Sequence, residues 1–199
     1  MVNDNTKVIK IAIQGGPGSF NEEAARWYAQ GHRIPKYDLV YSYTTEGVLR
    51  TVLSGEAERG VFAIQNSIGG MVQESIYSMA EHMFEIVDQF EIIVDHCLLV
   101  RPGLKLDDIS TIMSHPQALA QCQDTLKYSY NDKEQMSGDG EWIDQATAAK
   151  ALAEGDLPAS TAVLASKVNA DLYGLEIVDR ALQDRPDNYT TFLFVKAKD

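Results

Sequence analysis

A short stretch near the end of the sequence, Asn188-Tyr189-Thr190-Thr191-Phe192-Leu193-Phe194-Val195, organises the whole predicted fold. β-Branched and aromatic residues dominate it, which predicts a strand, and the polar residues 184–188 before it predict a turn. A last strand that completes a sheet brings its leading hydroxyls, Thr190 and Thr191, beside loops from far upstream. The sequence therefore favours a site assembled from distant segments.

Two of those upstream loops directly follow predicted strands. The apolar run 10–14 stops at Gly-Gly-Pro-Gly-Ser (15–19), and the nearly all-apolar run 60–64 stops at Gln-Asn-Ser-Ile-Gly-Gly (65–70). The second run is typical of a strand buried in a parallel sheet, and ligands bind at the carboxyl edge of such sheets. The glycine loop lacks the Lys-Ser/Thr pair of a P-loop and the dinucleotide pattern, but its backbone amides could hold a carboxylate.

A long β-rich stretch, residues 84–100, indicates a passage from one lobe to another, because strand and helix patterns alternate again after the turn 101–103. Residues 109–113 then predict a strand that leads into Ser114-His115-Pro116-Gln117 and a helix. We therefore predict an α/β protein with two lobes, residues 7–97 plus 179–199 and residues 98–178.

Composition and charge narrow the class of protein. The chain has 199 residues, of which 45% are hydrophobic and 23% charged, as in ordinary globular proteins. The net charge of -12 opposes binding to nucleic acid or anionic membranes, so an anionic ligand would need local helix N-termini or a few cations. No apolar run approaches the roughly 20 residues of a membrane helix and no signal-peptide core is present, so we expect a cytoplasmic protein.

Neither cysteine nor histidine spacing suggests a metal site. Cys97 and Cys122 lie in apolar segments without paired spacing, which predicts buried, reduced thiols. His32, His82 and His96 show no metal-ligand spacing with carboxylates or cysteines.

Three segments resemble the catalytic domain of prephenate dehydratase, namely residues 15–25 (Gly-Gly-Pro-Gly-Ser-Phe-Asn-Glu-Glu-Ala-Ala), residues 114–122 (Ser-His-Pro-Gln-Ala-Leu-Ala-Gln-Cys) and residues 188–192. Residues 64–70 and 164–175 extend the resemblance over essentially the whole chain. It implies a two-lobed fold similar to type II periplasmic binding proteins, with the active site in the cleft between the lobes. The implied reaction, in phenylalanine biosynthesis, converts the dianion prephenate to phenylpyruvate with loss of carbon dioxide and water. It implies no metal or organic cofactor and a homodimer, and we expect no C-terminal ACT regulatory domain.

By the same resemblance, four uncharged polar residues carry the chemistry. Thr190 would assist loss of the hydroxyl, while Asn66, Ser114 and Gln121 would orient that hydroxyl and the ring. Other residues are expected to contact the substrate: Ser19, Gly18, Gln65, Ser67, His115, Gln145, Thr191 and Phe192. Each of these residue types also has a structural interpretation, since serine caps helices, asparagine forms turns and the histidine stands at a helix start.

The chain departs from the family pattern at three positions. Thr191 replaces the arginine of the usual Thr-Arg-Phe, which is expected to grip a substrate carboxylate with two hydrogen bonds. Gln65 replaces a glutamate and Gln145 a common threonine, so one cation and one anion are lost together. Two alternatives stay open: a prephenate decarboxylase-like enzyme that does not aromatise the ring, and a non-catalytic module that binds a small anion.

Overall fold

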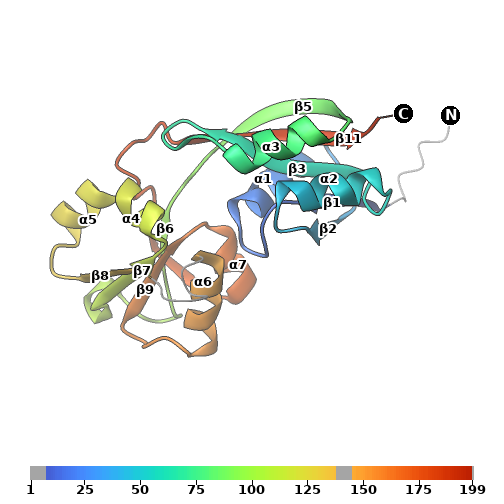
Figure 1. Ribbon diagram of the computed structural model, residues 1–199. Helices are drawn as coiled ribbons and strands as arrows, with labels where there is room; N and C mark the ends of the chain where they lie inside the picture. Colours follow the sequence, from blue (N-terminus) through green and yellow to red (C-terminus); the bar gives the residue numbers. More distant parts are fainter. Residues whose placement is uncertain (1–7, 138–144, 199) are drawn as a thin grey trace. The chain divides into compact units, whose positions relative to one another are not determined.

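The computed structural model describes residues 8–137 and 145–198, and it divides the chain into two compact units (Figure 1). One unit comprises Met1–Ile93 with Tyr189–Asp199, and the other comprises Val94–Asn188. Each unit contains its own sheet with helices, which confirms the predicted α/β class and the two-part organisation.

The unit boundaries differ from the predicted ones at 97/98 and 178/179. Cys97 already pairs with Ala165 in the sheet of the second unit, and Leu182 belongs to the buried core of that unit. The first crossing therefore comes four residues earlier and the second ten residues later than predicted. At the crossings, Val94 N–H donates to the Asn188 carbonyl at 2.7 Å, next to the register pair of Ile93 with Tyr189.

The sheet of the first unit has the strand order β2-β1-β3-β11-β5, with the short β4 paired to β3. Its first three strands are parallel, whereas β11 runs antiparallel between β3 and β5, as Figure 1 shows. The predicted last strand is thus confirmed as an interior strand of this sheet. The bounds are β1 Ile9–Ile13, α1 Phe20–Gly31, β2 Tyr37–Tyr41, α2 Thr45–Leu53, β3 Arg59–Asn66, β4 Gly70–Met71, α3 Gln73–Glu81, β5 Phe84–Ile93 and β11 Tyr189–Ala197.

Side chains of β11 alternate between two buried clusters on the two faces of this sheet. Phe192 and Phe194 pack in the cluster that contains α1 residues, while Leu193 and Val195 pack in the cluster that contains α2 residues. The register shifts next to β11 skip Ile64 of β3 and a residue of β5, so the alternation along β11 itself is regular. Thr190 therefore lies on the Phe192 face.

The sheet of the second unit has the order β10-β6-β9-β7-β8. Its central strands β6, β9 and β7 are almost entirely buried, and alanine-rich α6 packs closely on β9 because small side chains allow a near approach. The bounds are β6 Cys97–Val100, η1 Leu106–Asp108, β7 Thr111–Ser114, α4 Pro116–Gln121, α5 Gln123–Ser129, β8 Glu134–Ser137, α6 Gln145–Glu154, β9 Thr161–Ala165, α7 Val168–Tyr173 and β10 Glu176–Asp179.

Among the described residues, no helix is both long enough and apolar enough to cross a bilayer.

Candidate active site

The polar loops of the first unit gather at one edge of its sheet. Strands β1, β2 and β3 are parallel, so their carboxyl ends share this edge, and antiparallel β11 begins there. The edge therefore carries residues 14–19, residues 42–45, residues 66–70 and the start of β11. Open α/β sheets bind ligands at such an edge.

Asn66 and Thr190 form the central contact at this edge. The Asn66 side-chain amide donates to the Thr190 hydroxyl oxygen at 2.9 Å and to the Tyr189 carbonyl at 3.1 Å. Its carbonyl oxygen accepts from the backbone N–H groups of Ile68 and Gly69 at 3.0 and 2.7 Å. Because Thr190 accepts from Asn66, its own hydroxyl proton is directed to another acceptor. The structure brings these two predicted residues together.

Ser67 also fastens the loop after β3 to the start of β11. Its hydroxyl accepts from Tyr189 N–H at 2.9 Å, and its own N–H donates to the Tyr189 carbonyl at 2.8 Å. Ser67 thus acts on the position of Thr190 through the backbone.

The glycine loop is held by a carboxylate of the chain itself. Glu22 is fully buried and accepts from Gly18 N–H at 2.7 Å and from the Tyr41 hydroxyl at 3.2 Å. Arg26 donates two hydrogen bonds to the other Glu22 oxygen, at 2.8 and 2.6 Å. Burial opposes the charge of Arg26, but the bonds to Glu22 and the charge of Glu22 outweigh that effect and raise the pKa of Arg26.

This arrangement gives the Gly18 amide a partner within the chain. The amide donates to Glu22 and does not present a vacant position to a ligand carboxylate. Ser19 caps α1 by accepting from Glu22 N–H at 3.3 Å, and its hydroxyl keeps a proton to donate. Glu22, in the first turn of α1, therefore holds the glycine loop in place.

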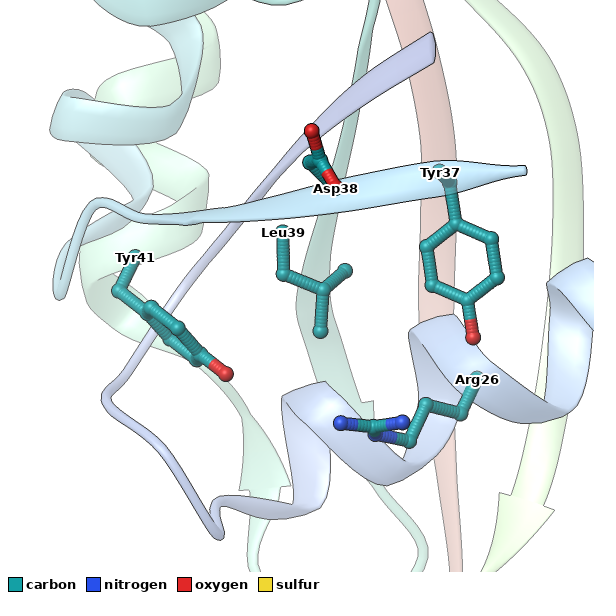
Figure 2. A pocket seen from close by; sticks show the side chains of 5 residues that line it. All are labelled: Arg26, Tyr37, Asp38, Leu39 and Tyr41. Carbon is teal, nitrogen blue, oxygen red and sulfur yellow. The ribbon is translucent and has the colours of Figure 1, made fainter. Parts of the chain in front are cut away.

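Arg26 also lines an open hollow of about 550 Å³ between α1 and β2. Figure 2 shows its guanidinium below the side chains of Leu39 and Tyr41, with Tyr37 further along the strand. Its two hydrogen bonds to Glu22 are the same ones that hold the glycine loop. The hollow therefore borders the ion pair that holds the glycine loop.

Thr191 points away from the face that carries Thr190. Its hydroxyl donates to a Glu91 carboxylate oxygen at 2.9 Å, and its register partners are Gln65 on β3 and Glu91 on β5. The three residues form a row across the sheet on the Leu193 face. The structure therefore does not group Thr191 and Gln65 with Thr190.

Phe192 is a core residue. It is 1% exposed and stacks on Phe90 with ring centroids 5.7 Å apart, so a ligand has no access to its ring. The expected contact between Phe192 and the substrate stays a prediction.

In the second unit, Ser114 and Gln145 form a closed set of hydrogen bonds. Ser114 is fully buried, donates to the Leu164 carbonyl at 2.7 Å and accepts from the Gln145 amide at 3.1 Å. The same Gln145 nitrogen lies 2.9 Å from the Leu164 carbonyl. The hydroxyl of Ser114 thus joins β7 to β9, and Gln145 joins the start of α6 to both strands.

Gln121 stands at the end of α4, beside the segments that enter and leave this unit. Its side-chain oxygen is 2.9 Å from His96 Nε2 and 2.9 Å from Asn188 Nδ2. His115 caps the same helix, since its Nδ1 accepts from Gln117 N–H at 3.1 Å. Sequence reasoning did not identify His96 as part of the site, because nothing in the segment around it, between Asp95 and Cys97, indicated this role.

The cysteine thiols and the possible metal ligands were also located in the structure. Cys97 and Cys122 are buried, as predicted, and burial, assisted by the nearby charge of Asp184, raises the pKa of Cys122 to about 12. Within residues 8–137 and 145–198, no group of three histidine, cysteine or acidic side chains could hold a metal ion.

Known proteins resemble this chain in sequence and in fold. The family model described as prephenate dehydratase matches residues 11–199. An Arabidopsis thaliana protein named arogenate dehydratase/prephenate dehydratase 6, chloroplastic, is 33% identical over 188 residues, which cover 94% of this chain and 43% of that protein. The chain thus spans less than half the length of this curated relative.

Two solved structures share the fold over 96% of this chain. The prephenate dehydratase of Arthrobacter aurescens in complex with L-Phe has a TM-score of 0.82 at 24% identity, with 61% of that chain covered. A structure described as GqqA, a novel type of quorum quenching acylase, has a TM-score of 0.78 at 28% identity, with 64% of that chain covered.

Proposed function

Because this chain belongs to the prephenate dehydratase family, we propose that it removes carbon dioxide and water from prephenate or arogenate and so forms an aromatic ring. The C4 hydroxyl leaves with a proton from solvent as water, and the ring carboxylate leaves as carbon dioxide. The electron pair of the broken carbon–carbon bond enters the ring. Prephenate would give phenylpyruvate, and arogenate would give phenylalanine.

The observation that carries this proposal is the Asn66–Thr190 hydrogen bond. A hydroxyl that accepts from an asparagine amide is oriented to donate its own proton, here toward the departing oxygen. Asn66 is itself fixed by two backbone donors and by the Tyr189 carbonyl, so the Thr190 hydroxyl is preorganised before a substrate binds. Aromatisation supplies the driving force, so orientation and a hydrogen bond to the leaving group are the contributions asked of the protein.

Ser114, Gln145 and Gln121 belong to the other unit, and we propose that they are its functional polar residues. Ser114 and Gln145 fix the ends of β7 and β9 relative to each other, because their hydrogen bonds go to each other and to Leu164. Gln121 is the member of this set that can donate to a substrate oxygen, since its carbonyl end is already engaged.

Acyl transfer, the activity in the description of GqqA, is less well supported by these contacts. It requires a nucleophile whose proton is taken by a base. The buried Ser114 hydroxyl gives its proton to the Leu164 carbonyl, and the neighbouring His115 uses Nδ1 to cap α4. We therefore prefer loss of water and carbon dioxide.

Product identification tests the proposal. The purified chain is incubated with prephenate and, separately, with arogenate, and the products are identified by mass spectrometry. Phenylpyruvate or phenylalanine supports it. A non-aromatic dihydro acid would indicate the decarboxylase-like alternative, and binding without turnover would indicate the non-catalytic module.

Assembly and location form a further part of the proposal. We propose a homodimer, as the family resemblance implies, and a cytoplasmic location, as the sequence pattern predicts. Light scattering coupled to gel filtration tests the dimer, and a mass equal to that of one chain would contradict it.

A further inference from the structure

The carbonyl oxygen of Gln121 has two donors from the segments where the chain enters and leaves the second unit. His96 Nε2 and Asn188 Nδ2 each lie 2.9 Å from it. Both are removed from solvent, since His96 is 2% exposed and Asn188 is fully buried. An amide oxygen has two lone pairs, so these two bonds use its full capacity as an acceptor.

The backbones of the same residues are also fixed. His96 N–H donates to the Gln183 side-chain oxygen at 3.1 Å, and the His96 carbonyl accepts from Leu182 N–H at 3.1 Å. Two residues further on, Asp184 N–H donates to the Gln121 backbone carbonyl at 2.8 Å. Residues 182–184 thus link the backbones of His96 and Gln121, and these links support the side-chain contact between the two residues.

We propose that His96 is a positioning residue whose Nε2–H, together with Asn188, fixes the side-chain amide of Gln121 with its NH2 group as the end offered to ligand. Gln121 is then a hydrogen-bond donor only, and the group it recognises is an oxygen of the ligand, such as a carboxylate, a carbonyl or a departing hydroxyl. The described contacts give this NH2 group no acceptor within the protein, and the residue is only partly buried.

The proposal requires a neutral imidazole with its proton on Nε2. Burial lowers the pKa of His96, and this effect outweighs the hydrogen bond to Gln121 and the nearby Asp95 carboxylate, which both favour the charged form. A neutral donor suits the neutral amide oxygen that it faces. This role of Gln121 rests on the proposed function, in which Gln121 donates a hydrogen bond to a substrate oxygen.

The state of the imidazole can be measured without substrate. The full chain is labelled with 15N-histidine, and the four ring systems are observed by two-dimensional NMR, with His96 assigned from the spectrum of His96→Gln. We expect a neutral ring protonated at Nε2. A ring protonated at Nδ1, or a charged ring at neutral pH, would overturn the proposal even if the protein proves to have no enzymatic activity.

Kinetics test whether His96 acts through Gln121. We expect His96→Leu to lower kcat/KM about tenfold, the effect of losing one oriented hydrogen bond. His96→Gln, which can place an NH2 donor near the position of Nε2, should recover most of that loss. In a Gln121→Ala background, His96→Leu should have less than about a twofold further effect.

Matched measurements separate positioning from folding. His32→Gln changes a histidine whose contacts are Tyr28 and Asp88, so it should leave kcat/KM unchanged. Equal losses from His96→Leu in both backgrounds would contradict positioning through Gln121. If His96→Leu does not fold, the NMR result and His96→Gln decide, and His96→Gln with activity as low as Gln121→Ala would contradict the proposal. Absence of turnover by the unmodified chain would reject the proposed function alone.

Discussion

At the scale of single residues, Thr190 carries the proposed chemistry, because its hydroxyl oxygen is held by Asn66 and the residue is only 9% exposed. Thr190→Val keeps the shape of the side chain and removes the donor. We expect kcat to fall about a hundredfold or more, the usual loss for one preorganised donor. Thr190→Ser, which keeps the hydroxyl, should retain activity within about tenfold. Steady-state rates measure both variants, and a Thr190→Val enzyme as fast as the unmodified chain would contradict this role.

Thr191 leads to a different expectation from the one that the family pattern suggests. An arginine at this position would lie in the row with Gln65 and Glu91, on the face opposite Thr190. We therefore expect Thr191→Arg to pair with Glu91 and to change the KM for the substrate less than about threefold. Any change that Thr191→Arg makes to the melting temperature should disappear in a Glu91→Gln background, because the arginine then has no carboxylate to pair with. A KM lowered tenfold or more would instead indicate that the arginine grips a substrate carboxylate.

At the scale of elements, the glycine loop depends on Glu22 at the start of α1. Glu22→Gln removes the charge that accepts from Arg26, Gly18 and Tyr41. Hydrogen bonds to charged groups contribute about 1.5–3 kcal/mol, and the half-exposed Arg26 places the expected loss of unfolding free energy at the lower end. Urea unfolding measures this loss.

A matched control for this loss is Glu154→Gln, in the exposed Lys150–Glu154 pair of α6. It should change the free energy of unfolding by less than about 1 kcal/mol. Equal effects of the Glu22 and Glu154 substitutions would show that the buried network does not hold the loop.

Some features of these elements can be predicted from the sequence and others cannot. Alternation of apolar and aromatic residues correctly predicts β11, and the position of Thr190 at its start follows from that. The Glu22–Gly18 contact could not be predicted, because an acid in the first turn of a helix is ordinarily assigned to the helix dipole. The Glu22 carboxylate is held by Arg26 and Tyr41, and only the folded structure brings these two side chains to it.

His96 illustrates the same limit for the site. It lies between Asp95 and Cys97 in an otherwise apolar stretch, and nothing in its local pattern distinguishes a core histidine from a positioning one. Its partners Gln121 and Asn188 are 25 and 92 positions away in the sequence. Contacts of this kind are set by the tertiary path of the chain and have no periodic signature.

At the scale of the whole molecule, His96 links stability to pH. Because burial lowers its folded-state pKa below the unfolded value of about 6.5, the unfolded chain binds the proton more readily. The corresponding stability is fully present above about pH 6.5 and is lost as the pH falls toward the folded-state pKa. The melting temperature should therefore fall from about pH 7.5 to about pH 5.5, and by less in His96→Gln. The same fall in both proteins would contradict this assignment.

The account as a whole rests on one claim, that the chain removes both carbon dioxide and water from the same substrate molecule. The direct measurement uses prephenate labelled with 13C in the ring carboxylate and follows labelled carbon dioxide and phenylpyruvate together by NMR; arogenate is examined in parallel. We predict one carbon dioxide for each aromatic product, with both losses slowed equally in Thr190→Val. Carbon dioxide released without an aromatic product, or neither product from either substrate, would contradict the account.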